Sequence, residues 1–169
     1  MPKDAADLHV ERWRDHWVLD HPFDDQVEAM TVRVIALTRS FRAATKSAAA
    51  AVGLEDFEYA TLHELMIRDT PGRASPTELA EAAKVSPAGM SGRLDTMERK
   101  GLVKRTPGRD DRRRVDVEAT RKGREIWNRA MELRGRAEDD AASALTPREL
   151  ATLNRLLKKM TLRLEGDGG

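Results

Sequence analysis

The chain has 169 residues, of which 40% are hydrophobic and 4% aromatic, with 30 Lys and Arg against 29 Asp and Glu. This length suits one domain, or one domain with appended helices. The chain has no cysteine, which excludes disulfides, thiolate metal sites and a Cys nucleophile. The apolar runs are too short to cross a bilayer and the N-terminus lacks a signal-peptide pattern, so we expect a cytoplasmic protein without a membrane partner.

The net charge of +1 is an average over an uneven distribution. Residues 99–124 contain eleven Lys and Arg but four Asp and Glu, whereas residues 1–28 contain three and eight. The basic block makes a polyanion a candidate partner, although such blocks are often merely solvated surface.

The first half of the chain predicts three helices. An N-terminal extension, residues 1–22, contains an amphipathic helix at 5–19 whose apolar side holds Leu8, Trp13 and Trp17. A long helix at 24–52 carries an apolar stripe, and Gly53 ends it. A third helix is expected at 55–68, followed by a loop at 69–74.

Three later helices begin with the same local chemistry. Ser75, Ser86 and Thr146 each precede a proline, so the hydroxyl can accept a free N–H of the first turn. Glu78 and Glu149 complete two capping boxes. These signals predict helix starts at residues 76, 87 and 147.

The basic block falls on a predicted hairpin. Residues 102–106 and 114–118 have the composition of two strands, joined by 107–113. Helices at 120–144 and 147–164 follow, and we expect the tail 166–169 to be disordered.

A short helix, a turn at 84–86 and a second helix predict a helix-turn-helix, and the hairpin adds a wing. On the second helix Met90, Leu94 and Met97 face inward, while the opposite face is small, polar and nearly free of acid. Such a face suits either a DNA major groove, where Arg93 could contact guanine, or a helix–helix contact. Arginines in the hairpin loop fit a minor groove and favour DNA. The predicted DNA contacts are Ser75, Thr77, Ser86, Pro87, Ala88, Gly89, Ser91, Gly92, Arg93, Arg109, Asp111, Arg112, Arg113 and Arg114.

Between residues 24 and 164 the sequence resembles the MarR family of winged helix-turn-helix regulators, most specifically at 75–80, 90–103 and 110–117. The family's Asp-x-Arg wing motif falls on Asp111 and Arg113. The resemblance implies a mainly α fold with a small β-wing and a homodimer built from residues 23–53 and 120–165. It also implies a DNA-binding lobe at 54–119 that binds a pseudo-palindromic operator, and a ligand-responsive repressor.

The Trp-containing N-terminal helix resembles the branch of that family that senses urate or small carboxylates. Two of that branch's charged pocket positions fall here on Ala60 and Ile67, which favours a phenolic or apolar effector, or none. The resemblance implies an effector pocket formed by Trp13, Trp17, Tyr59, Ala60, His63, Ile67, Arg68 and Arg93.

Other classes of protein fit the sequence less well. The chain has no P-loop, G-x-S-x-G or H-E-x-x-H motif, and its histidines lack metal-ligand spacing, so we expect no enzyme, cofactor or metal. The alternatives are a helical module whose basic wing binds an acidic protein, a constitutive regulator without a ligand, and a small enzyme using His63.

Overall fold

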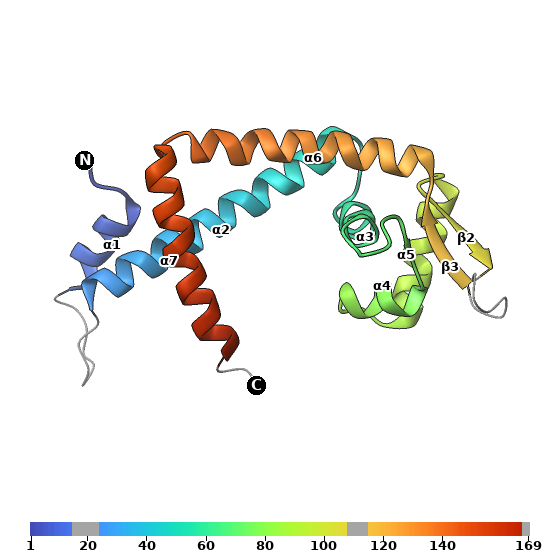
Figure 1. Cartoon of the computed structure of the whole chain (residues 1–169), viewed down its shortest axis with the longest axis horizontal. Coiled ribbons are helices and arrows are strands. Elements are labelled where there is room, and N and C mark those ends of the chain that lie inside the picture. The colour runs from blue at the N-terminus through green and yellow to red at the C-terminus, as the bar shows by residue number, and fades with distance from the viewer. Residues whose placement is uncertain (15–23, 108–114, 167–169) are drawn as a thin grey trace. The chain divides into compact units, whose positions relative to one another are not determined.

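The computed structural model describes residues 1–14, 24–107 and 115–166 (Figure 1). These residues form seven helices and one three-stranded antiparallel sheet in the order β1-β3-β2. The elements are α1 (Ala5–Trp13), α2 (Asp25–Ala51), α3 (Asp56–Met66), β1 (Arg73–Ala74), α4 (Pro76–Ala82), α5 (Pro87–Arg99), β2 (Val103–Pro107), β3 (Val115–Ala119), α6 (Arg121–Ala142) and α7 (Pro147–Gly166). The mainly helical fold with a small β-wing is confirmed.

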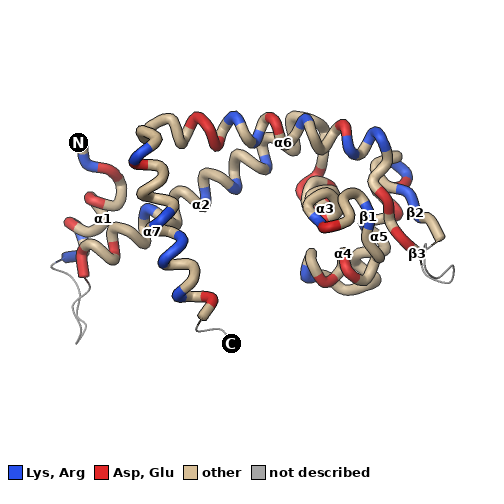
Figure 2. The backbone as a smooth tube through the Cα atoms, in the orientation of Figure 1, with Lys and Arg blue, Asp and Glu red and all other residues tan. Residues whose placement is uncertain are grey.

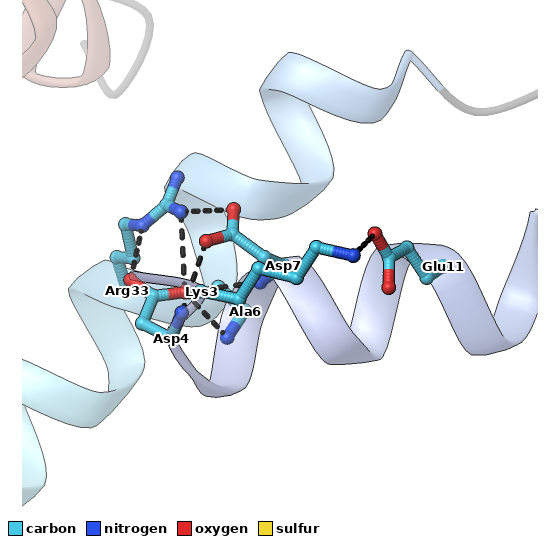
Figure 3. Close-up of polar contacts among 6 residues, drawn as sticks. All are labelled: Lys3, Asp4, Ala6, Asp7, Glu11 and Arg33. Atoms are coloured by element: carbon cyan, nitrogen blue, oxygen red, sulfur yellow. Dashed lines mark hydrogen bonds and ion pairs between the residues drawn. The ribbon is translucent and has the colours of Figure 1, made fainter. Parts of the chain in front are cut away.

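The chain divides into two compact units, Met1–Ser47 and Ala48–Gly169. In the first unit α1 begins at Asp4, whose carboxylate accepts the N–H groups of Ala6 and Asp7 in a capping box. Arg33 of α2 donates to the carboxylates of both Asp4 and Asp7 (Figure 3). The hydrogen bond from Arg33, followed by the one from the Asp7 N–H, lowers the pKa of Asp4 to about 2. Ion pairs therefore attach α1 to α2.

The buried face of α1 differs from the predicted one. Ala6 and Val10 are buried, whereas Leu8 and Trp13 are exposed at 54% and 40%. The contact with α2 is made by small side chains and charged groups, so the large apolar residues are left toward solvent. Trp17 lies outside the described residues.

The second unit holds the main hydrophobic core. Its largest fully buried apolar side chains come from α3, α4, α5 and the strands, namely Leu62, Leu65, Leu79, Met90, Leu94, Met97, Val103 and Val117, and Ala130 of α6 is buried among them. The inward face predicted for the second helix of the helix-turn-helix, Met90, Leu94 and Met97, is confirmed. The core of the winged lobe is therefore completed by α6.

The sheet contains one strand that the sequence did not indicate. Arg73 and Ala74, predicted as loop, form β1 and pair with Glu118 and Val117 of β3. Gly72 precedes it at φ +84° and donates its N–H to the Leu65 carbonyl. A two-residue strand carries no periodicity, so only the tertiary pairing defines it.

The helix starts predicted from the caps at residues 76, 87 and 147 are confirmed. Ser75, Ser86 and Thr146 each accept an N–H of the first turn, from Glu78, Gly89 and Glu149. At the far end, Gly166 belongs to α7 and not to a disordered tail, while 167–169 lie outside the described residues. Within the described ranges, no helix combines the length and apolar character needed to span a membrane.

Helix α6 meets the end of α5 at unusually short range. A Cβ added to Gly123 would lie 2.1 Å from the carbonyl oxygen of Leu102, so only glycine fits there. Thr120, the cap of α6, donates its hydroxyl to the Gly101 carbonyl at 2.6 Å, and Lys122 Nζ donates to the Lys100 carbonyl at 2.7 Å. The N-terminus of α6 is thereby fixed to the residues that follow α5.

Candidate nucleic-acid interface

The N-terminal half of α5 presents an exposed face of small side chains. Pro87, Ala88, Gly89, Ser91 and Gly92 are all exposed, and the first turn contains no acidic residue. The Ser86 hydroxyl accepts the Gly89 N–H at 3.1 Å, which satisfies one of the free donors at the helix start. This face can approach a flat or grooved partner closely.

The turn between α4 and α5 is held by backbone hydrogen bonds. Val85 N–H donates to the Ala80 carbonyl at 3.0 Å, and Lys84 adopts a positive φ of 52°. At the other end of α4, Ser75 both caps the helix and donates its N–H to Glu78, which lowers the pKa of that carboxyl. The Ser75 hydroxyl is therefore engaged within the fold, whereas Thr77 is exposed.

Arg93 lies on the flank of α5 that faces α3. Its guanidinium carbon is 5.7 Å from the centre of the Phe57 ring, and the side chain is half-buried. A guanidinium over an aromatic face is attracted by the ring's negative quadrupole. Arg93 is thus held against α3 at the side of the small-residue face.

Strands β2 and β3 carry both basic and acidic residues (Figure 2), and most of these charges are paired with neighbours. Lys104 Nζ is 3.0 Å from Glu118, Arg73 Nε is 2.9 Å from Asp116, and Arg105 contacts carboxylates of α5. Part of the basic block seen in the sequence therefore holds the sheet together instead of facing a partner. The predicted wing contacts Arg109, Asp111, Arg112, Arg113 and Arg114 lie outside the described residues.

A buried carboxylate anchors the C-terminal end of α5. The sequence did not predict this contact. Glu58 of α3 is fully buried, and its Oε1 lies 2.7 Å from Lys100 Nζ. A buried carboxylate without a partner would be costly, so this pair ties α5 to α3. The signal was not local, because 42 residues separate the partners.

The residues predicted to hold an effector are only partly brought together. Tyr59 and His63 of α3 stack at 5.7 Å between ring centres, and Trp127 of α6 lies 6.1 Å from His63. Arg134 of α6 donates to the Tyr59 hydroxyl at 3.2 Å.

Three of the predicted positions do not join this cluster. Ala60 and Ile67 are exposed, and Arg68 pairs with Glu78 at 3.3 Å. Trp127 and Arg134 were not predicted, because they follow His63 by more than 60 residues.

The aromatic cluster also contains polar atoms without protein partners. Within the described part of the chain, His63 Nδ1 and Trp127 Nε1 are buried and accept or donate no hydrogen bond. Burial, followed by the charge of Arg134, lowers the pKa of His63 below its ordinary 6.5. Within these ranges, no group of three or more His, Asp or Glu could hold a metal ion.

Known proteins similar to this chain share the winged lobe. Residues 52–114 match the model of the MarR family. The HTH-type transcriptional regulator PecS of Dickeya dadantii is 30% identical over 107 residues, which are 63% of this chain and 64% of PecS. The chain therefore spans less than two thirds of the length of that relative.

Solved structures of the same fold cover more of the chain. Apo MarR from E. coli matches with a TM-score of 0.61 and 25% identity over 76% of this chain and 94% of that one. A MepR variant from S. aureus, bound to an oligodeoxyribonucleotide, matches with a TM-score of 0.61 and 19% identity over 80% and 97%. The winged helix-turn-helix architecture is thereby confirmed.

Proposed function

We propose that this chain, whose residues 52–114 match the MarR family, is a sequence-specific DNA-binding transcriptional regulator. The observation that carries the proposal is the exposed face of small side chains on the N-terminal half of α5, whose first turn has no acidic residue and which lies between α4 and a β-hairpin. A helix of this kind can enter a major groove, where its small side chains let the backbone approach the bases. The names of PecS, a transcriptional regulator, and of the DNA-bound MepR variant support this assignment.

In this arrangement the predicted contacts divide by role. The small residues of α5 line the groove, and Arg93 leaves Phe57 to reach a base edge. The wing arginines Arg112 and Arg113 enter a flanking minor groove, whose negative potential favours them. Repression follows where the operator overlaps a promoter.

We propose a homodimer as the functional unit. Helix α7 has no buried residue, and five apolar side chains recur along it at spacings of three and four: Leu150, Leu153, Leu157, Met160 and Leu164. Helix α2 likewise exposes Val27, Val34, Leu37 and Phe41. A second copy is the natural occupant, because two-fold symmetry places two α5 helices on one pseudo-palindromic site.

The effector, if bound in each lobe, lies against the aromatic cluster of α3 and α6. Unpartnered His63 Nδ1 and Trp127 Nε1 beside Arg134 suit a small phenol or carboxylate. A ligand shifts DNA affinity only through unequal affinity for the two states of the protein. A titration of salicylate against the DNA complex tests this part separately from DNA binding.

The main test is selection of duplexes from a random-sequence library, followed by binding at several salt concentrations. We expect enrichment of an inverted repeat, and log affinity falling with log salt by about 0.9 per phosphate contact. Ser91→Asp places a negative charge on the α5 face and should abolish binding. Asn128→Asp, on an exposed face of α6, is the matched control.

The outcomes separate the candidate functions. Salt-independent binding, or Ser91→Asp and Asn128→Asp behaving alike, would contradict the proposed function. Binding that survives without enrichment of a sequence would leave a non-specific DNA-binding protein. The chain would then lack the base readout assigned to α5.

A further inference from the structure

Helix α5 carries two carboxylates directly below its small-residue face. Asp95 and Glu98 follow Ser91 at spacings of four and three, so the three residues form one row along the helix. This row lies on the flank toward β2. In the proposed DNA complex, two free carboxylates there would repel the phosphates beside the groove.

Arg105 of β2 lies on this flank, where its backbone N–H and both terminal guanidinium nitrogens donate hydrogen bonds to α5. One guanidinium nitrogen donates to Glu98 Oε2 at 2.7 Å, and the other donates to Asp95 Oδ1 at 2.7 Å and to the Ser91 carbonyl at 3.4 Å. The backbone N–H of Arg105 donates to Glu98 Oε1 at 3.0 Å. A single residue thus engages all three members of the row.

The hydrogen bonds between Arg105 and α5 stabilise the charged forms of the groups that they join. The hydrogen bond to Asp95 raises the pKa of Arg105, and the N–H of Arg105 lowers the pKa of Glu98. The Arg105 guanidinium and the Glu98 carboxylate are therefore both held in their charged forms. The adjacent cation, Lys104, is paired with Glu118 on β3 and does not contribute to this cluster.

We infer that Arg105 is a positioning residue for DNA binding, which holds the Asp95 and Glu98 carboxylates against the wing strand and fixes β2 to the recognition helix. This inference rests on the proposed function. Arg105 acts through the two carboxylates and not by touching DNA. It offsets one of their two charges and keeps both from turning toward the phosphates.

The fork of the guanidinium is essential to this role. Arginine presents several N–H donors in one rigid plane, whereas lysine is a flexible point charge. The geometry needs donors for two carboxylates and one carbonyl at once. Lysine at this position would leave one carboxylate unmatched.

The experiment compares variants on the duplex that the wild-type protein enriches from a random library. Arg105→Met should weaken binding about tenfold or more, because two unmatched carboxylates then face the phosphates. Lys104→Met makes the same charge change one residue away and should weaken binding less. Arg105→Lys should fall between Arg105→Met and the wild type.

A double-mutant cycle distinguishes positioning from direct contact. Asp95→Asn with Glu98→Gln should raise the affinity of Arg105→Met by a larger factor than it raises that of the wild type. Equal factors in the two backgrounds would mean that the charges act independently, and would overturn the inference. Arg105→Met binding as well as Lys104→Met would overturn it too.

Folding is monitored in parallel by urea unfolding. If Arg105→Met fails to fold, Arg105→Lys takes its place in the cycle, and wild-type affinity in that variant overturns the inference. Failure of the wild type to enrich any duplex would contradict the proposed function instead. The two failures are therefore distinct.

Discussion

The winged lobe and helix α7 differ in the burial of their apolar side chains. In the lobe, α3, α4, α5 and the strands close a core in which Leu62, Leu65, Leu79 and Met90 are fully buried. Along α7, leucines at regular spacing are between 37% and 74% exposed. The apolar side chains of the lobe are therefore already removed from water within the chain, whereas those of α7 are not.

This difference assigns the two regions to different tasks. Burial of apolar surface drives folding and association alike, so a leucine contributes to whichever process removes it from water. Leucines of the lobe should govern unfolding of the single chain. Leucines of α7 should govern self-association.

The largest expected effect is in the lobe core. Leu62→Ala should lower the free energy of unfolding by about 2–5 kcal/mol, through lost transfer energy and the cavity left behind. Urea unfolding monitored by circular dichroism measures it. Leu162→Ala, the same change at a side chain 56% exposed on α7, should cost far less. Equal losses would remove the distinction between the regions.

Self-association is the next test. Leu157→Glu places a charge in the apolar row of α7 and should weaken the proposed homodimer by about a hundredfold or more, because the carboxylate loses its water on association. Analytical ultracentrifugation gives the dissociation constant. Leu162→Glu is the matched control, since Leu162 lies on the opposite face of α7. A dimer insensitive to Leu157→Glu would move the interface elsewhere.

Substituting two glycines of α6 by alanine should change the free energy of unfolding by intermediate amounts and in opposite directions. Gly123→Ala should destabilise by about 1–3 kcal/mol, because its Cβ has no room beside the Leu102 carbonyl. Gly135→Ala meets no atom within 4 Å and should stabilise by up to about 1 kcal/mol. Thermal unfolding compares them. Similar shifts in Tm would show that α6 is not fixed to the lobe.

The smallest effect is a pH dependence centred on His63. Burial lowers the pKa of this imidazole in the folded chain, so the unfolded chain binds a proton more readily near its ordinary pKa of 6.5. Stability should therefore fall as pH falls through that value, and His63→Gln should lessen the fall. The charges that act on His63 are Arg134, which opposes protonation, and Glu64, which favours it. An unchanged slope of urea midpoint against pH would contradict this assignment.

The sequence predicted those elements whose ends or faces depend on residues within one or two turns. Ser75, Ser86 and Thr146 predicted helix starts because a hydroxyl and a following proline act within one turn. The buried row of α5 followed from spacings of three and four. Strand β1 escaped prediction because its two residues are extended only through pairing with β3.

The candidate site was less predictable for the same reason. The small face of α5 could be read from the sequence, since it occupies consecutive turns. The partners of Glu58 and Arg105 could not, because each ion pair joins different elements. Counting charges along residues 99–124 therefore overstated the basic surface. Several of its cations, Arg105 among them, serve the fold.

The glycine contact at Gly123 has a mechanical consequence. Since α6 abuts the end of α5 without an intervening side chain, and Thr120 and Lys122 bond the carbonyls there, the two helices transmit motion as one body. Helix α6 has 22 residues and is about 33 Å long. A tilt of about 10° about its far end would move α5 by about 6 Å, close to the rise of two base pairs. In the proposed homodimer the long helix would act as a lever, so that small rotations at the dimer interface would change the spacing of the two α5 helices.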